Sequence, residues 1–329
     1  MLSVICPIYN EEKYIVACID SIIAQDYPKD DLEVLLMDGM STDRTRELIS
    51  PYLPNCPYLR LLDNPGRTAP RALNRGIAEA QGDVILRIDA HSSYPSNYFS
   101  TLVRRLFELN ADNVGAVWKT VVMNETPKSL AIREVLSHSL GVGNALFRTG
   151  ITEVREVDTV PFGCWRRDVF DKYGLFDERL TRNQDIELNK RIIRGGGKIY
   201  LVPDTYCTYY ARETFDKLFD NNYSNGKWNI MTVYYTREMS SLSLRHFVPL
   251  LFILSLLLPV IAGFFWHPLW LITAFILLIY LSLIGTVSAK LAKSKGLSFI
   301  RLIESFFILH FSYGLGSLMG LLSIPFTKR

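Results

Sequence analysis

The chain has 329 residues, of which 49% are hydrophobic and 21% are charged. This composition excludes a disordered protein and allows one large domain or two smaller ones. The formal net charge is only +3, and from Phe247 onward the chain carries six basic residues and one acidic residue. A nearly neutral N-terminal part followed by a basic, apolar C-terminal part argues against nucleic-acid binding and favours a membrane-anchored protein.

The cysteines and the N-terminus indicate the compartment. The five cysteines show no CxxC spacing, which predicts neither a disulfide framework nor a zinc site and favours a reducing compartment. Residues 1–7 lack the basic stretch of a signal peptide, and their apolar run ends at Asn10. We therefore expect the N-terminal part to lie in the cytoplasm.

The first 240 residues alternate short apolar strands with helical segments. This alternation predicts an α/β domain over residues 1–240, with a mostly parallel sheet, flanking helices and ligands at the carboxyl ends of the strands. The predicted strands are 2–7, 32–37, 58–62 and 84–88, and the predicted helices are 14–25, 43–50 and 69–80.

Residues 241–329 form the predicted membrane domain, beginning at a boundary near Arg237–Arg245. Three uncharged apolar windows, 247–266, 269–289 and 305–326, each reach the roughly 20 residues that a membrane-spanning helix needs. Only His267 and Pro268 separate the first two windows, which predicts a hairpin, and the basic residues at 290–301 favour a cytoplasmic location for its base. For the third window a crossing helix, an interfacial helix and a re-entrant segment all stay open.

Polar residues follow three of the predicted strands, at Tyr9–Glu12, at Asp38 and at Asp89-Ala90-His91. Each acid alone could be a helix cap, but parallel strands bring all three to one edge of the sheet. Asp38 could accept the ring N–H of a base. Asp89 and His91 could bind one divalent metal ion, Mn²⁺ or Mg²⁺, that bridges a diphosphate.

The order of five motifs resembles family 2 glycosyltransferases with the GT-A fold. The motifs are CPIYNEE (6–12), MDGMSTDRT (37–45), NPG (64–66), ALNRG (72–76) and DAH (89–91). The run RIDAH (87–91), followed by Tyr94-Pro95 and Tyr98, is most similar to the succinoglycan-type, membrane-associated exopolysaccharide glycosyltransferases. The resemblance covers roughly residues 1–230.

The resemblance implies a site for a UDP-sugar and a divalent metal ion. Asp38 matches the acid that recognises uracil, and His91 replaces the last aspartate of the family's DxD metal-binding motif. Arg67 and Arg71 could neutralise phosphate charge. The implied donor-binding residues are Pro7, Tyr9, Glu11, Asp38, Asp43, Arg67, Arg71 and Asp89, and the implied metal ligands are Asp89 and His91.

The segment NQDIEL (183–188) resembles the family's Glu-Asp-x-Glu-Leu segment, with Gln184 in place of the usual glutamate. The resemblance implies that Asp185 is the general base of an inverting transfer. Alternatively, Asp185 only stabilises the N-terminus of a helix that Asn183 caps and that runs to Arg194. Gly163, Lys227 and Trp228 are the expected acceptor-binding residues.

These features predict an enzyme, a hexosyltransferase of polysaccharide or glycoconjugate biosynthesis. The Gln-x-x-Arg-Trp segment of processive synthases is missing, which favours transfer of a single sugar to a polyprenyl-linked or saccharide acceptor. We expect a multi-pass protein of the cell membrane with its catalytic domain at the cytoplasmic face. Two alternatives stay open: a sugar-phosphate nucleotidyltransferase, although residues 6–12 lack its Gly-rich phosphate loop, and a non-catalytic membrane protein that binds nucleotide-sugars.

Overall fold

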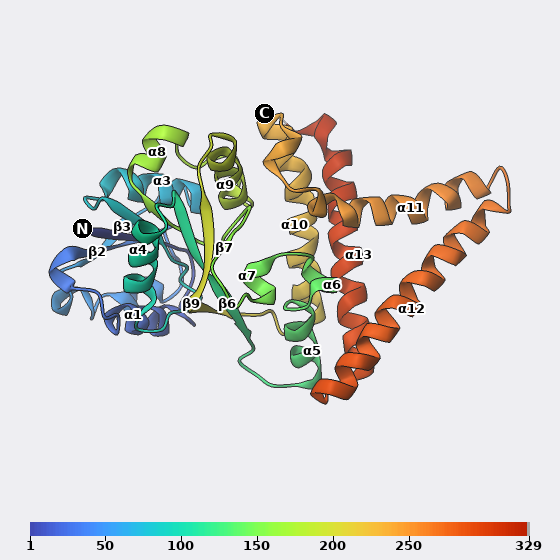
Figure 1. Cartoon of the computed structure of the whole chain (residues 1–329), viewed down its shortest axis with the longest axis horizontal. Coiled ribbons are helices and arrows are strands. Elements are labelled where there is room, and N and C mark those ends of the chain that lie inside the picture. Colours follow the sequence, from blue (N-terminus) through green and yellow to red (C-terminus); the bar gives the residue numbers. More distant parts are fainter. Residues whose placement is uncertain (328–329) are drawn as a thin grey trace. The chain divides into compact units, whose positions relative to one another are not determined.

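The computed structural model describes residues 1–327 and divides the chain into two compact units (Figure 1). The first unit comprises Met1–Lys119 and Leu146–Tyr210, and the second comprises Thr120–Ala145 and Ala211–Arg329. This division differs from the boundary near Arg237–Arg245 that the sequence favours. The reason is that α10 (Phe215–Thr236), which precedes that boundary, packs along α13 (Phe299–Ser323).

A mixed nine-stranded sheet forms the centre of the first unit in the described residues, with the order β3-β2-β1-β4-β8-β6-β9-β5 and with β7 beside β9. The expected parallel arrangement applies to β1 (Leu2–Ile8), β2 (Leu32–Asp38), β3 (Leu59–Asp63) and β4 (Val84–Arg87). Antiparallel pairs join β4 to β8, β8 to β6, and β9 to both β5 and β7. The bounds of these strands are β5 (Ser92–Ser93), β6 (Asn113–Val121), β7 (Arg155–Glu156), β8 (Cys164–Arg166) and β9 (Ile199–Tyr210).

Helices cover both faces of this sheet, as the alternation along β1 requires. Val4 and Cys6 pack with α1, α2 and α4, whereas Ile5 points to the opposite face and packs with α3, α8 and α9. Strands buried on both faces are continuously apolar, which is why the sequence reveals them. The helices of this unit are α1 (Ile15–Ile23), α2 (Thr45–Ile49), α3 (Ala69–Glu79), α4 (Tyr98–Glu108), α7 (Leu146–Thr149), α8 (Asp168–Tyr173) and α9 (Gln184–Arg194).

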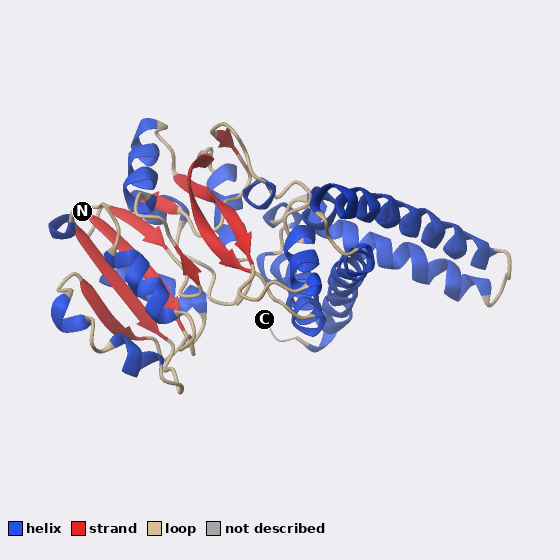
Figure 2. Ribbon diagram, turned by 90° about the horizontal axis from the view of Figure 1, so that it is seen from below, coloured by secondary structure: helices blue, strands red, loops and turns tan. Residues whose placement is uncertain are grey.

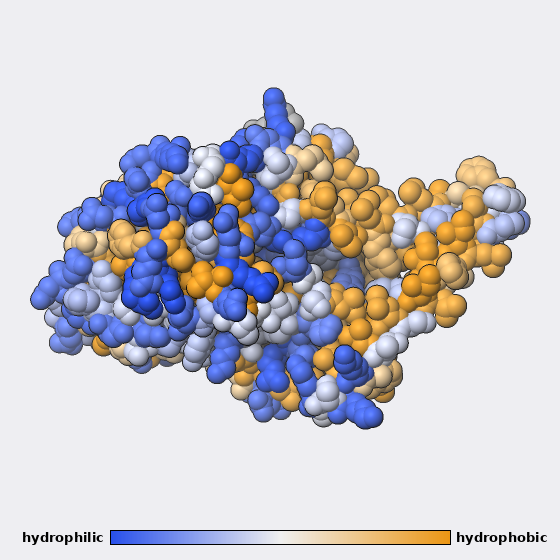
Figure 3. All heavy atoms as spheres, viewed as in Figure 1, coloured by the Kyte–Doolittle hydropathy of each residue, from blue (hydrophilic) through white to orange (hydrophobic). Residues whose placement is uncertain are grey.

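The second unit is helical and apolar (Figures 2 and 3). It contains α5 (Pro127–Val135), α6 (Ser139–Val142), α10, α11 (Val248–Gly263), α12 (Leu269–Lys295) and α13. Among the described residues, three helical segments are long and apolar enough to cross a membrane: Leu244–Gly263, Leu269–Lys295 and Phe299–Phe326. They correspond to the three predicted windows, and α11 and α12 form the predicted hairpin.

Close backbone contact joins α10 to α13. A Cβ atom on Gly226 of α10 would overlap the carbonyl oxygen of Tyr313, and a Cβ atom on Gly316 of α13 would overlap that of Tyr223. Polar bonds add to this contact, because Asn229 Nδ2 donates to the Tyr313 hydroxyl at 2.5 Å. Small residues at these positions therefore let two helix backbones approach each other.

The ends of the apolar helices are tied to the short helices of the same unit. Lys295, the last residue of α12, lies 2.6 Å from the buried carboxylate of Glu134 on α5. Because Glu134 is only 7% exposed, removal of its charged partner would leave a buried carboxylate uncompensated. This ion pair fixes the basic end of α12 beside α5.

We predict that Gly226→Ala lowers the melting temperature of the detergent-solubilised protein, because the added methyl group forces α10 and α13 apart. The free energy of unfolding should fall by about 1–3 kcal/mol. The matched control is Gly285→Ala in α12, where a Cβ atom meets nothing within 4 Å. The control should be neutral or slightly stabilising, since alanine favours helix. Equal melting temperatures for the two variants would contradict the tight packing.

Candidate functional site

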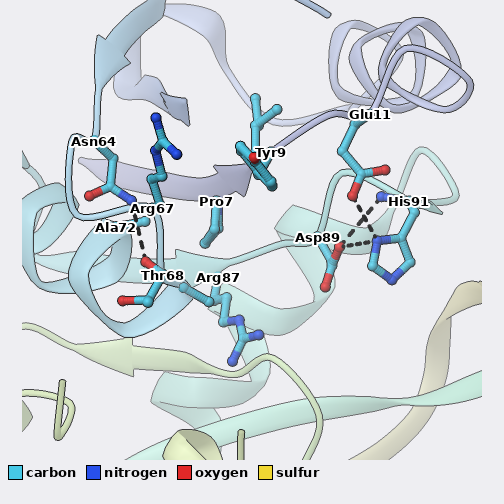
Figure 4. A pocket seen from close by; sticks show the side chains of 12 residues that line it. Pro7, Tyr9, Glu11, Asn64, Arg67, Thr68, Ala72, Arg87, Asp89 and His91 are labelled. Carbon is cyan, nitrogen blue, oxygen red and sulfur yellow. Dashed lines mark hydrogen bonds and ion pairs between the residues drawn. The ribbon is translucent and has the colours of Figure 1, made fainter. Parts of the chain in front are cut away.

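A cavity of about 200 Å³ opens at the carboxyl ends of β1 and β4 (Figure 4). Three chain segments supply its walls: the β1–α1 loop, the β3–α3 loop with the start of α3, and the end of β4 with the residues after it. The lining residues are Pro7, Ile8, Tyr9, Glu11, Asn64, Arg67, Thr68, Ala69, Ala72, Arg87, Asp89 and His91.

Hydrogen bonds join the segment 6–12, which enters the β1–α1 loop, to the segment 37–45, which enters the β2–α2 loop. Asn10 has a left-handed backbone (φ 55°), and its side-chain oxygen accepts a hydrogen bond from the Thr42 N–H at 2.9 Å. The Glu11 N–H in turn donates to Thr45 Oγ1 at 2.7 Å. The β1–α1 loop therefore depends on the β2–α2 loop for the conformation that presents Tyr9 and Glu11 to the cavity.

Asp38 is fully buried and lies outside the cavity lining. Its carboxylate accepts hydrogen bonds from the Ser41 hydroxyl at 2.5 Å and from Arg46 Nη1 at 2.6 Å. Asp38 thereby stabilises the β2–α2 loop. Its recognition of uracil stays a prediction.

Asp43 also organises this loop and lies outside the cavity lining. Its carboxylate accepts hydrogen bonds from the Thr45 hydroxyl at 2.6 Å and from the Glu12 N–H at 3.2 Å. Desolvation raises the pKa of Asp43, but these hydrogen bonds outweigh it and the pKa lies below its usual value. Asp43 is therefore a negatively charged acceptor at neutral pH.

Asp89, His91 and Glu11 form a contiguous cluster on one side of the cavity. His91 Nδ1 lies 2.9 Å from Asp89 Oδ1 and 3.3 Å from Glu11 Oε1. The Asp89 carboxylate is the main cause that raises the pKa of His91 to about 11, against the opposing effect of burial. Burial raises the pKa of Asp89, but the positive charge of His91 outweighs it and the pKa is lowered. The Tyr94 hydroxyl braces this turn by accepting a hydrogen bond from the Asp89 N–H at 2.7 Å.

The two predicted phosphate-binding arginines lie in different surroundings. Arg67 lines the cavity and has a left-handed backbone (φ 58°), which the β3–α3 turn imposes. Arg71 is half exposed, does not line the cavity and lies 3.3 Å from the Glu178 carboxylate.

Asp185 lies in the first turn of α9, and two other acids near it in sequence are engaged by arginines. Glu187 pairs with Arg191 at 2.8 Å, and Asp177 pairs with Arg179 at 2.7 Å. Asp185 accepts a hydrogen bond from the Ile186 N–H at 2.9 Å, its Oδ2 lies 3.9 Å from Arg87 Nη1, and its side chain is 26% exposed. The role of Asp185 as the general base stays a prediction.

The start of α9 differs in detail from the expectation. Asn183 occupies the N-cap position, but it adopts a left-handed backbone (φ 63°) and its side chain makes no capping hydrogen bond. The helix does end at Arg194, as expected.

The expected acceptor residues fall into both units. Gly163 (φ 114°) lies next to β8, where a Cβ atom would overlap the Trp165 ring, and its carbonyl accepts the Arg87 N–H at 3.0 Å. Lys227 and Trp228 belong to α10 in the second unit. The acceptor roles of all three residues stay predictions.

Comparison with known proteins decides the family. Residues 3–174 match the model described as "Glycosyl transferase family 2". The succinoglycan biosynthesis protein ExoA of Rhizobium meliloti is 31% identical over 249 residues, which cover 75% of this chain and 74% of that protein. The chain belongs to glycosyl transferase family 2.

Two further similarities agree with the assignment of this chain to the family. A dolichyl N-acetyl-α-D-glucosaminyl phosphate 3-β-D-2,3-diacetamido-2,3-dideoxy-β-D-glucuronosyltransferase of Methanococcus voltae is 27% identical over 68% of this chain and 71% of that one. The mannosyltransferase PcManGT from Pyrobaculum calidifontis, solved with GDP-Man and Mn²⁺, superposes with a TM-score of 0.58 at 19% identity. It covers 95% of this chain and 86% of that chain, and its likeness confirms the expected GT-A fold.

One prominent residue of the glycosyltransferase's cavity, Arg87, was not predicted from the sequence. It ends β4, two residues before Asp89, and is only 7% exposed. An arginine within the otherwise apolar run 84–88 is the signal in the sequence that could have revealed it. Asn64 and Thr68 were also missed as lining residues.

The side chains on the cavity wall suit a divalent metal ion in their chemistry. Asp89 and Glu11 offer carboxylate oxygens, and His91 would offer an imidazole nitrogen after losing the proton that these carboxylates stabilise; Mn²⁺ and Mg²⁺ both accept such ligands. Within residues 1–327, no group of three or more His, Cys, Asp or Glu side chains has the geometry of a complete metal site. The roles of Asp89 and His91 as ligands of such an ion stay predictions.

We predict that Asp89→Ala abolishes turnover and weakens donor binding, because the diphosphate would lose the carboxylate that bridges it through the metal ion. Sugar transfer and nucleotide-sugar binding are measured, with Asp171→Ala as the control because Asp171 is an exposed acid of α8. Full activity of Asp89→Ala, or undiminished activity of the wild type in excess chelator, would contradict the metal assignment.

Proposed function

We propose that this glycosyltransferase moves a single sugar, with inversion of the anomeric carbon, from a UDP-sugar to a lipid-linked or saccharide acceptor at the cytoplasmic face of a membrane. The observation that carries the proposal is the cavity at the ends of β1 and β4, where Glu11, Asp89 and His91 meet. Ligands of open α/β sheets bind at this edge.

Donor binding would combine three kinds of contact. Pro7 and Tyr9 would hold the nucleoside, and Arg67 would face the negative charge of the diphosphate. Asp89 and His91 would hold a divalent metal ion, which supplies charge neutralisation of the leaving diphosphate when bound. The similar mannosyltransferase was solved with GDP-Man and Mn²⁺, which supports a divalent metal ion and a nucleotide-sugar donor for this chain as well.

Asp185 would act as the general base of the transfer. As the acceptor hydroxyl oxygen forms its bond to the anomeric carbon, the hydroxyl proton passes to the Asp185 carboxylate. The bond from that carbon to the diphosphate oxygen breaks at the same time, and the nucleoside diphosphate leaves with the electron pair. A single displacement of this kind inverts the anomeric configuration.

The acceptor would reach the site from the membrane. The relative in Rhizobium meliloti carries the name of a succinoglycan biosynthesis protein, and the relative in Methanococcus voltae acts on a dolichyl phosphate-linked sugar by its name. Together with three helices long and apolar enough to span a bilayer, these names support a polyprenyl-linked acceptor. The basic loop at 290–301 supports a cytoplasmic orientation of the hairpin base.

A donor screen tests the function directly. Membranes containing the protein are incubated with UDP-glucose, UDP-galactose, UDP-N-acetylglucosamine and GDP-mannose, and release of the nucleoside diphosphate is monitored with and without membrane lipid extract. We expect release from one UDP-sugar, increased by the extract. Release from GDP-mannose alone would overturn the UDP assignment.

We predict that Asp185→Asn lowers turnover by ~10²-fold or more with nearly unchanged affinity for the UDP-sugar, because the amide keeps the shape but accepts no proton. Steady-state kinetics and donor binding are measured together. A rate that drops only in proportion to donor affinity would assign Asp185 a structural role, and retention of anomeric configuration in the product would exclude the single displacement.

We predict that α11 and α12 cross the membrane as a hairpin whose tip lies outside the cell. Cysteines are introduced as Pro268→Cys at the tip and Ser294→Cys near the base. All five native cysteines are buried, so background labelling should be low. An impermeant thiol reagent added to intact cells should label position 268 and spare position 294. The reverse pattern would contradict the orientation, and Thr327→Cys in the same assay shows whether α13 also crosses.

A further inference from the structure

Arg87 is a buried cation that lacks hydrogen-bond partners on the wall of the donor cavity. Its side chain is 9% exposed, and it lines the cavity together with Asp89 (Figure 4). Its Nε and Nη1 atoms are buried and make no hydrogen bond. Buried N–H donors without acceptors are costly, more so on a charged group, so a ligand that satisfies them would bind favourably.

The surroundings hold the guanidinium in place without using these donors. The Phe162 ring lies 5.5 Å below the guanidinium carbon, which orients the planar group by a cation–π contact. Asp185 Oδ2 lies 3.9 Å from Nη1, close enough for an ion pair but too far for a hydrogen bond. Arg87 therefore faces the Asp185 carboxylate while its N–H groups stay available.

The position of Arg87 lies between the two ends of the proposed reaction. Arg87 lines the cavity together with Asp89, two residues further along the chain, which is the residue proposed to hold the diphosphate through the metal ion. In an inverting transfer the base and the leaving group lie on opposite sides of the anomeric carbon. The donor sugar would therefore lie between Asp185 and Asp89, and Arg87 lines the cavity with Asp89 while its Nη1 lies 3.9 Å from Asp185 Oδ2.

We propose that Arg87 binds the hydroxyl groups of the donor sugar with its Nε–H and Nη1–H and positions the Asp185 carboxylate toward the acceptor. This inference rests on the proposed function, because it assumes that the cavity holds a nucleotide-sugar. Arg87 takes up no proton in the step. The proton of the acceptor hydroxyl still passes to Asp185, and Arg87 keeps that carboxylate aligned while it fixes the sugar ring.

The experiment compares UDP with the nucleotide-sugar that the wild-type protein turns over in the donor screen. UDP lacks the sugar, so its affinity for Arg87→Met should equal that of the wild type. The affinity of the variant for the nucleotide-sugar should fall roughly 10- to 100-fold, the range expected for lost hydrogen bonds from a charged donor. Arg104→Met is the matched control, because Arg104 is an exposed arginine of α4.

A second arm separates sugar binding from positioning of the base. Arg87→Lys keeps a positive charge beside Asp185 but loses the planar fork, so it should restore part of kcat and little of the nucleotide-sugar affinity. In the double variant Arg87→Met/Asp185→Asn, the loss of affinity should persist. The two losses in kcat should not multiply, since there is no carboxylate left to position.

Four results would overturn the proposal or its basis. Equal loss of UDP and nucleotide-sugar affinity in Arg87→Met would show that Arg87 only supports the fold of the cavity. Unchanged nucleotide-sugar affinity would exclude contact with the sugar, and multiplicative losses in kcat would exclude positioning of Asp185. If the wild type turns over none of the screened donors, the proposed function itself fails and the Arg87 proposal fails with it.

Discussion

The parallel pairing of β1 with β4 is the constraint on which the site depends. Its register sets Ile5 opposite Arg87, the last residue of β4, while β1 continues to Ile8, and the residues that follow the two strands meet at the same edge of the sheet. Glu11 follows β1 and His91 follows β4, and only this register brings their side chains to within 3.3 Å. A shift by one residue would turn Arg87 to the opposite face of the sheet and away from the cavity.

The balance of charge in the cavity follows from the same arrangement. Glu11 and Asp89 are the acids on its wall, Arg67 and Arg87 are its permanently charged bases, and His91 is neutral when it holds a metal ion. In the family's usual motif an aspartate stands in the place of His91, which would add a further negative charge. This chain therefore presents a more positive wall to a diphosphate, and the attraction acts before any specific contact forms.

Much of the first unit could be predicted from the sequence, because parallel strands buried on both faces are short, continuously apolar runs followed by polar residues. The ends of β1, β2 and β4 were found in this way, and so were Tyr9, Glu11, Asp89 and His91. Contacts between distant segments could not be found. The approach of Arg87 to Asp185, the bond from Arg46 that engages Asp38, and the packing of α10 on α13 all join residues whose local sequence carries no sign of the partner.

The division of the second unit into two stretches of chain has a consequence for its biosynthesis. Residues 120–145 leave the ribosome before the second half of the catalytic sheet, whereas α12 and α13 follow much later. Glu134 on α5 is therefore synthesised long before Lys295, its partner in the ion pair. During that interval α13, the helix against which α5 finally packs most extensively, does not yet exist, so α5 would depend on chaperones or on early contact with the bilayer.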